Sequence, residues 1–340
     1  MTPEPILVIG GGPAGMAAAI EIASRGLRAE LFEQTSRLSG KAWEYGCKAD
    51  SECRSCNVCK VHRMIRQVQD SQNILTHLRS TVFDIQHREQ RFTVSWRDET
   101  GDTHSTTSSS IVIATGFDFF DPHLCSRYGY GRIPDVITSA EFERQLQGSS
   151  LPKRISDGSA PGAIGFIQCV GSRDPRGGAP FCSQTCCAYS LRMASRLVYL
   201  DPDLQVTIFY SDLQSLSPET DRLLNSLNPR IRLVRSLPAE IIRLESGRLE
   251  VTTESDMGTM ESHEFHTIVL AIGFRPSQSL RHSILGIGLE LNPYGFIQEP
   301  AGSGVLAVVG AALGPMNLAK TIDQSISAVT RMITLNRGSS

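Results

Sequence analysis

Four of the nine cysteines lie between residues 169 and 187, where they follow the pattern C-x12-C-x3-C-C. The apolar run Ala163–Val170 is typical of a buried parallel strand, and Ser183–Leu200 has the pattern of a helix. In an open α/β sheet, ligands bind just beyond the carboxyl ends of the strands. Four thiolates gathered at such an edge can hold one iron–sulfur cluster. The expected ligands of this cluster are Cys169, Cys182, Cys186 and Cys187.

A second cysteine group lies nearer the start of the chain, with Cys47, Cys53, Cys56 and Cys59. Its C-x2-C-x2-C core is similar to part of a ferredoxin ligand run, although the usual x3-Cys-Pro is missing. A second iron–sulfur cluster is the preferred interpretation. Three alternatives stay open: a redox dithiol drawn from Cys53/Cys56 or Cys56/Cys59, a structural zinc site, and handling of substrate or persulfide by one thiolate.

The beginning of the chain has the full pattern of a dinucleotide-binding site. The apolar strand Ile6–Ile9 runs into G-x-G-x-x-G, a helix follows, and a second strand leads to Glu33. Gly10 allows the tight turn, Gly12 lets the backbone approach a pyrophosphate, and Gly15 lets helix and strand pack closely. The pyrophosphate is expected at the helix N-terminus, and Glu33 is expected to accept hydrogen bonds from a ribose.

Two later strands favour FAD over NAD at this site. Residues 111–116 form an apolar strand that ends in Ala-Thr-Gly, and residues 304–310 form another strand of this kind. Residues 314–317 then open a helix whose free backbone N–H groups are expected to face the flavin pyrimidine carbonyl. Further contacts to FAD are expected from Pro13, Ala14, Gln34, Gly40, Lys41, Thr115, Gly116, Gly310, Met316 and Asn317.

These elements predict an α/β flavoprotein with two dinucleotide-binding domains. The FAD domain is expected to comprise residues 1–155 and 290–340. It is split around a smaller Rossmann-like domain, residues 156–289, which carries the first cysteine group. The phosphate-binding turn of that second domain should read G-x-G-x-x-G, but residues 169–174 read CVGSRD. We therefore expect a cluster site in place of a nicotinamide site.

Composition and charge exclude several other classes of protein. The net charge of −2 gives no nucleic-acid footprint, and no apolar run approaches the roughly 18 residues that span a bilayer. The N-terminus has no basic region followed by a long apolar core, so no signal peptide is expected. Clustered cysteines without a secretion signal are typical of reduced metal or redox chemistry. We therefore expect a cytoplasmic protein.

Three segments resemble the A subunit of heterodisulfide reductase. They are the first cysteine segment, residues 128–143 (YGYGRIPDVITSAEFE) and residues 314–328 (GPMNLAKTIDQSISA). The resemblance implies FAD in a thioredoxin-reductase-like core, with a 4Fe–4S cluster held by the four cysteines named first. The chain has no ferredoxin-like domain, so it is most similar to the short form found in sulfur oxidisers and to the related subunit of a quinone-interacting oxidoreductase. The resemblance implies electron transfer to partner subunits in sulfur metabolism, and we expect a homodimer.

The chain departs from related proteins at two positions. The last strand of the flavin domain is usually followed by an aspartate that binds the ribityl chain, and Ala311 stands there. The heterodisulfide reductase family often has a lysine near the flavin five residues after the last cluster ligand, and here that residue is Arg192. Arg192, together with Arg173 and Arg176, is expected to offset the negative charge of the cluster.

Two other functions are compatible with the sequence. The first is a self-contained NAD(P)H-dependent disulfide reductase that uses one of the dithiols of the second cysteine group. The second is a flavin-containing scaffold whose cysteine sites hold zinc.

Overall fold

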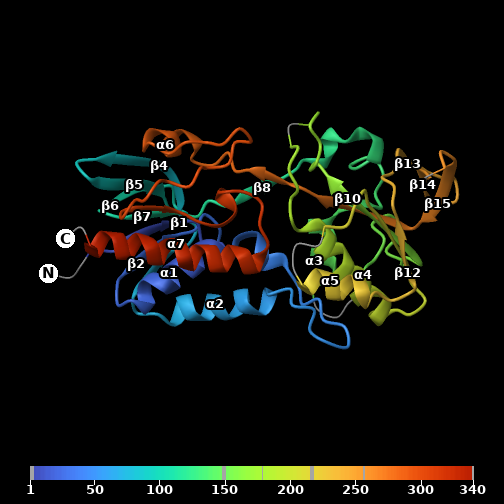
Figure 1. Ribbon diagram of the computed structural model, residues 1–340, viewed down its shortest axis with the longest axis horizontal. Helices are drawn as coiled ribbons and strands as arrows, with labels where there is room; N and C mark the ends of the chain where they lie inside the picture. The colour runs from blue at the N-terminus through green and yellow to red at the C-terminus, as the bar shows by residue number, and fades with distance from the viewer. Residues whose placement is uncertain (1–3, 148–150, 178, 215–217, 256, 339–340) are drawn as a thin grey trace. The chain divides into compact units, whose positions relative to one another are not determined.

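The computed structural model describes residues 4–147, 151–177, 179–214, 218–255 and 257–338 and divides the chain into two compact units (Figure 1). Unit 1 comprises Met1–Trp43, Asn57–Asp118 and Arg275–Ser340, and unit 2 comprises Glu44–Cys56 and Phe119–Phe274. Each unit is built on its own five-stranded parallel sheet. No helix of the described residues is both long and apolar enough to cross a membrane.

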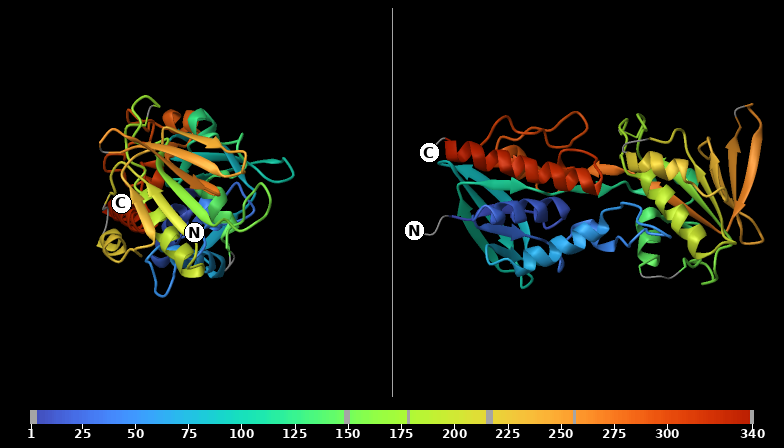
Figure 2. Two further views of the ribbon diagram at one scale, coloured as in Figure 1. Left: turned by 90° about the vertical axis from the view of Figure 1, so that its right-hand side faces the viewer. Right: turned by 60° about the horizontal axis from the view of Figure 1, so that its bottom comes forward.

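The sheet of unit 1 has the strand order β18-β7-β1-β2-β3. Its central strands β1, β2 and β7 are short and fully buried, and they are apolar except for Glu30 of β2, as expected for a parallel sheet covered on both faces. Helix α1 packs against α7 and α2, which the views in Figures 1 and 2 show as neighbouring rods. An antiparallel sheet, β4-β5-β6, completes the unit. The elements are β1 (Ile6–Ile9), α1 (Pro13–Ser24), β2 (Ala29–Phe32), α2 (Val58–Asp70), β3 (Ile74–His77), β4 (Thr81–Arg88), β5 (Arg91–Arg97), β6 (Thr103–Ser108), β7 (Ile111–Ile113), α6 (Arg281–Gly286), β18 (Leu306–Val308) and α7 (Leu318–Gly338).

The sheet of unit 2 has the strand order β12-β11-β10-β16-β9. Helix α4 packs on β10 and β11, and its apolar face joins them in one core. The antiparallel strands β13, β14 and β15 follow one another as a meander, which Figure 2 shows in orange. The elements are β9 (Val136–Thr138), α3 (Ser139–Gln145), β10 (Ala163–Val170), α4 (Cys186–Leu200), β11 (Gln205–Phe209), α5 (Pro218–Asn225), β12 (Ile231–Val234), β13 (Glu240–Arg243), β14 (Leu249–Glu254), β15 (Met260–Phe265) and β16 (Thr267–Ile272).

The two parallel sheets have the same internal layout. In unit 1 the chain moves outward from β1 to β2 and β3 and then returns to the other side of β1 as β7. In unit 2 it moves from β10 to β11 and β12 and returns to the other side of β10 as β16. The strand order therefore reverses beside β1 and beside β10, and such reversal points are where open α/β sheets bind their ligands. The glycine turn follows β1, and Cys169 is the last residue but one of β10.

The division into units differs from the domain boundaries expected from the sequence. Residues 119–155 lie in unit 2 because β9 pairs with β16 of the second sheet. The second crossover falls at β17 (Phe274–Pro276), so residues 275–289 lie in unit 1. Residues 44–56, which include Cys47, Cys53 and Cys56, also belong to unit 2, whereas Cys59 lies in the first turn of α2 in unit 1.

Candidate functional site

The glycine turn after β1 is shaped by backbone contacts that leave no room for side chains. A Cβ on Gly15 would lie 1.8 Å from the Gly10 carbonyl oxygen, and a Cβ on Gly10 would lie 2.4 Å from that of Ala114. Gly10 also has a φ of 110°, which favours glycine. In contrast, a Cβ on Gly12 would meet no protein atom within 4 Å. The turn thus packs tightly on its strand side and is open at Gly12, as a bound pyrophosphate requires.

Glu33 directly follows β2, and its carboxylate is hydrogen-bonded to the backbone of this turn. It is buried and accepts a 2.9 Å hydrogen bond from the Gly11 N–H and a 2.8 Å bond from the Thr35 N–H. The backbone N–H of Ser39 donates to the Gly11 carbonyl at 2.7 Å. The Ser39 hydroxyl is fully buried and has no protein partner, although buried polar groups are nearly always hydrogen-bonded. An orphaned hydroxyl beside an open glycine turn fits a site that holds a polar ligand, and the residues present fit FAD.

Several other predicted FAD contacts border the same turn. A Cβ on Gly40 would lie 3.4 Å from the Gly12 Cα, and a Cβ on Gly310 would lie 2.4 Å from the Ala14 Cβ. The Asn317 side chain accepts a 2.9 Å bond from the Lys320 N–H, so it caps α7. All predicted FAD contacts lie in unit 1, and those for which the structure gives no contact to the turn are Gln34, Lys41, Gly116, Met316 and Asn317.

The first cysteine group gathers at the reversal point of the second sheet. Cys169 has a left-handed backbone (φ 60°) at a register shift between β10 and β16. A non-glycine residue in this conformation is uncommon, and such residues are enriched at functional sites. Cys186 and Cys187 form the first turn of α4 and are buried. Cys182 lies half-buried in the loop between β10 and α4. One βα turn therefore carries all four thiols.

The four thiols influence one another electrostatically, and burial favours the protonated form of three of them. The pKa of Cys169 is raised to about 11, chiefly by burial and next by the neighbouring Cys187. The Arg173 guanidinium opposes this rise. Burial, followed by Cys169, Cys187 and Cys182, raises the pKa of Cys186. Burial also raises the pKa of Cys187. A bound metal centre supplies the positive charge that thiolates need in such a place.

Two backbone N–H groups already point at the sulfur atoms. The Gln184 N–H donates to Cys182 Sγ at 3.2 Å, and the Gln214 N–H donates to Cys187 Sγ at 3.5 Å. Such bonds stabilise thiolates and tune iron–sulfur clusters. Near Cys169 in the chain, the buried amide of Gln168 and the hydroxyl of Ser172 have no protein partner. The donor set and these orphaned groups fit an iron–sulfur cluster.

The described residues contain no group of three or more His, Cys, Asp or Glu side chains arranged to hold a single metal ion. In a 4Fe–4S cluster each thiolate binds a different iron, so the four sulfur atoms surround a larger volume than four ligands of one ion. The fit of the cysteine turn to a cluster therefore depends on the donor types, their burial and their hydrogen bonds.

The loop of residues 44–56, which carries Cys47, Cys53 and Cys56, is held to the rest of unit 2 by charged side chains. Glu143 of α3 is buried, pairs with the buried Lys48 ammonium and accepts a 2.8 Å bond from the Gly46 N–H. Further along the same loop, the Arg196 guanidinium donates to the Ala49 carbonyl at 2.8 Å. No pattern in the sequence singles out Glu143 or Lys48, apart from the position of Glu143 in the segment 128–143.

The three arginines expected around the first cysteine group have different roles in the structure. Arg173 lies close enough to Cys169 and Cys187 to oppose the rise in their pKa values, and it pairs with Asp212. Arg176 is exposed. The guanidinium of Arg192 donates to backbone carbonyls of the other cysteine group, and its expected effect on the charge of the first cluster stays a prediction. The helical spacing from Cys187 could not reveal this, since the partner loop lies far away in the sequence.

Loss of the buried pair should destabilise the protein strongly. The Glu143→Ala variant leaves the Lys48 ammonium buried without a counter-charge, and we expect the free energy of unfolding to fall by about 3–5 kcal/mol. Urea unfolding followed by circular dichroism measures this change. The control is Glu44→Ala, which removes a surface pair with Arg144 and should cost about 0–1 kcal/mol. Equal small effects of both variants would contradict the anchoring role of Glu143.

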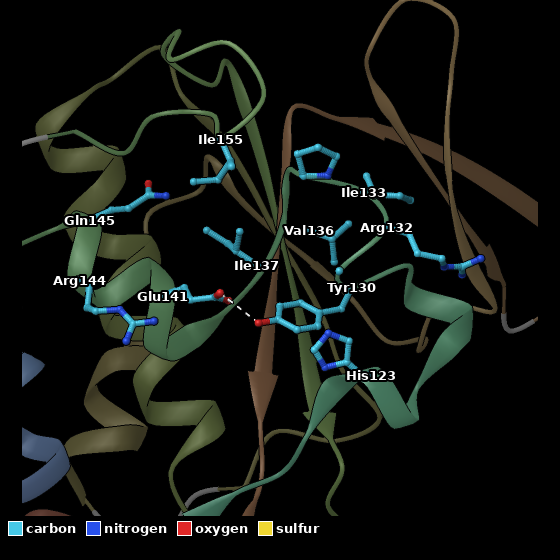
Figure 3. A pocket seen from close by; sticks show the side chains of 12 residues that line it. His123, Tyr130, Arg132, Ile133, Val136, Ile137, Glu141, Arg144, Gln145 and Ile155 are labelled. Carbon is cyan, nitrogen blue, oxygen red and sulfur yellow. Dashed lines mark hydrogen bonds between the residues drawn. The ribbon is translucent and has the colours of Figure 1, made fainter.

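The segment 128–143 also lines a cavity of about 530 Å³ in unit 2 (Figure 3). Val136 and Ile137 form its apolar floor, and the Tyr130 hydroxyl donates to Glu141 at 3.0 Å. The other oxygen of Glu141 accepts from the backbone and side chain of Thr138, which closes a capping box at the start of α3. These bonds fix α3, and α3 carries the Glu143 anchor.

Comparison with known proteins agrees with this architecture. Residues 4–155 match the pyridine nucleotide-disulphide oxidoreductase family. Thioredoxin reductase of T. acidophilum superposes with a TM-score of 0.65, 13% identity and full coverage of both chains. The Lactococcus lactis enzyme gives a TM-score of 0.64 and 15% identity, covering 98% of this chain and 99% of its own. The predicted fold class is confirmed: the protein has the two-dinucleotide flavoprotein fold of thioredoxin reductase.

Within that fold class, the relatives found by sequence are A subunits of heterodisulfide reductases. The chain is 32% identical over 240 residues to the A subunit of the H(2):CoB-CoM heterodisulfide,ferredoxin reductase of Methanothermobacter thermautotrophicus, which is 65% of this chain and 36% of the relative. It is 32% identical over 241 residues to an iron–sulfur A subunit of the CoB–CoM heterodisulfide reductase of Methanopyrus kandleri, 66% of this chain and 37% of the relative. The predicted resemblance is confirmed: about two thirds of the chain is homologous to the A subunit of heterodisulfide reductase. The match spans little more than a third of those relatives.

Proposed function

We propose that this protein is an iron–sulfur flavoprotein that transfers electrons within a heterodisulfide reductase-like complex of sulfur metabolism. The proposal depends chiefly on the turn after β10. That turn occupies the position in the second sheet that the glycine turn occupies in the first, yet it carries four thiols that act on one another electrostatically. A protein with thiols in place of the nicotinamide-binding turn is suited to pass electrons on, rather than to take hydride from NAD(P)H.

The residues of unit 1 would hold FAD. Gly12 offers the open backbone for the pyrophosphate, Glu33 offers a buried carboxylate for the ribose, and Ser39 offers an unpartnered hydroxyl. Bound FAD supplies exchange between two-electron and one-electron chemistry, and a 4Fe–4S cluster supplies one-electron transfer.

The residues of unit 2 would hold the cluster through Cys169, Cys182, Cys186 and Cys187. The N–H groups of Gln184 and Gln214 and the charge of Arg173 stabilise negative charge on these sulfurs. Burial raises the pKa values of Cys169, Cys186 and Cys187, so these three thiols are protonated before assembly. Cluster binding would therefore release protons. Cys47, Cys53, Cys56 and Cys59 are proposed as ligands of a second cluster.

We propose further that the substrate disulfide binds on a partner subunit, that the protein forms a homodimer, and that it works in the cytoplasm. The relatives are themselves named as subunits of heterodisulfide reductases, which supports partner subunits here.

The isolated protein should therefore not accept hydride from NAD(P)H. On anaerobic mixing with excess NADH or NADPH, we expect the flavin absorbance to remain oxidised for minutes, because the second domain lacks a nicotinamide-binding turn. Dithionite should bleach the flavin and produce an electron paramagnetic resonance signal from a reduced cluster. Stopped-flow absorbance and low-temperature spectra record both results.

The rival functions predict different results from the same experiment. Bleaching by NADPH within seconds, with reduction of a disulfide substrate by the protein alone, would establish a self-contained disulfide reductase. Zinc in place of iron, without a broad visible band beside that of the flavin, would establish the scaffold.

A further inference from the structure

Within unit 2, helix α4 links the first cysteine group to the loop that carries Cys53 and Cys56 of the second group. Cys186 and Cys187 form its first turn. Arg192 follows five residues after Cys187, about 7.5 Å further along the helix axis. One rigid element therefore carries ligands of the first group at its end and contacts the second group about one and a half turns later.

The contacts of Arg192 are directed at the backbone between two cysteines. Its Nε donates to the Arg54 carbonyl at 2.8 Å, and a terminal nitrogen donates to the Ser55 carbonyl at 3.4 Å. These two carbonyls lie between Cys53 and Cys56 in the chain. A planar guanidinium that binds two successive carbonyls fixes both the position and the orientation of that segment.

The Arg192 guanidinium therefore lies beside the segment between Cys53 and Cys56. Burial lowers the pKa of Arg192, and the neighbouring side chains of Cys56, Glu219 and Cys53 oppose this change. The side chain of Arg54, which is the other cation of the segment, is paired with Asp50 at 2.6 Å and with Glu52 at 2.8 Å. Arginine stays protonated in proteins, so the charge of Arg192 remains beside Cys53 and Cys56.

We propose that Arg192 is a positioning residue for the second cysteine group, and that it raises the reduction potential of the iron–sulfur centre formed there. Reduction adds one electron, and hence one negative charge, without making or breaking a bond to Arg192. A fixed positive charge stabilises the reduced state more than the oxidised state. The inference depends on the proposed function only in taking the second group as an iron–sulfur centre.

The test is a redox titration of the purified holoprotein, followed by electron paramagnetic resonance. Loss of one signal in Cys56→Ala identifies the second centre. At the potential where the wild-type centre is half reduced, Arg192→Gln should lower its ratio of reduced to oxidised form about tenfold, which is about 59 mV for a one-electron couple. Arg192→Lys retains the charge and should shift the ratio less.

Arg196→Gln is the matched control. It removes a guanidinium from the same helix that holds the same loop, but at Ala49, away from the segment between Cys53 and Cys56. We expect no shift of the second centre in this variant. The signal that depends on Cys186 serves as an internal reference in every sample and should move less than that of the second centre in Arg192→Gln.

Several outcomes decide the proposal. Loss of the second centre in Arg192→Gln with retention in Arg192→Lys would support positioning by the charged group. An unchanged potential in Arg192→Gln, or an equal shift in Arg196→Gln, would overturn the proposal. A wild-type protein without any Cys56-dependent centre would also overturn it, and would leave the proposed function intact if the Cys186-dependent signal were present.

Discussion

Replacement of Cys186 by alanine is expected to remove about four irons and four sulfides per flavin, the content of one 4Fe–4S cluster. Cys186 is buried at the start of α4, and its thiol interacts electrostatically with Cys169, Cys187 and Cys182. A methyl group cannot ligate iron, and three remaining thiolates leave one iron without a protein ligand. Iron, sulfide, zinc and flavin analysis of anaerobically purified protein measures the loss.

Cys125→Ala is the control for this prediction. Cys125 is half-buried and packs against the apolar core of unit 2, so its replacement should leave the iron content unchanged. Flavin content should stay at the wild-type value in both variants, which would show that unit 1 remains folded. A fall from about eight irons to about four would mean that both cysteine groups hold clusters. An iron content in Cys186→Ala equal to that of the wild type would contradict the assignment of the first cluster.

The local part of the fold could be predicted from the sequence. The apolar strands β1 and β10 are recognisable because both faces of a central parallel strand are buried, which gives a continuous apolar run. The expected strand 163–170 matches β10 in both bounds. The helix expected from Ser183 begins at Cys186, because residues 183–185 lie in the loop that carries Cys182. Position at the end of a strand was enough to locate both candidate sites.

The assignment of residues 44–56 to unit 2 could not be predicted in this way. It depends on contacts across large separations in sequence: the Glu143 carboxylate pairs with Lys48, and the guanidinium groups of Arg196 and Arg192 donate to the backbone carbonyls of Ala49 and Arg54. Neither periodicity nor a short motif carries information on such pairs. The sequence shows only that a loop leaves the first domain, and the buried charges decide which unit holds it. The unpartnered hydroxyl of Ser39 could not be predicted for a similar reason, because it is apparent only from its burial.

The glycine turn allows FAD binding to be separated from folding by two single substitutions. A Cβ at Gly12 meets no protein atom within 4 Å, and the residue has an ordinary φ of −70°. Gly12→Ala should therefore leave the stability of the flavin-free protein unchanged, while its methyl group occupies the space of the pyrophosphate. Overpacking of about 1–3 kcal/mol corresponds to a loss of affinity for FAD of roughly ten- to a hundredfold.

Gly15→Ala should act on folding instead. Its Cβ would lie 1.8 Å from the Gly10 carbonyl oxygen, so α1 must move away from β1 whether FAD is bound or not. We expect the flavin-free protein to lose about 1–3 kcal/mol of stability. Thermal unfolding of the flavin-free variants and fluorescence titration with FAD separate the two effects. If Gly12→Ala binds FAD as tightly as the wild type, the pyrophosphate does not lie against this turn, and the open backbone at Gly12 has another purpose.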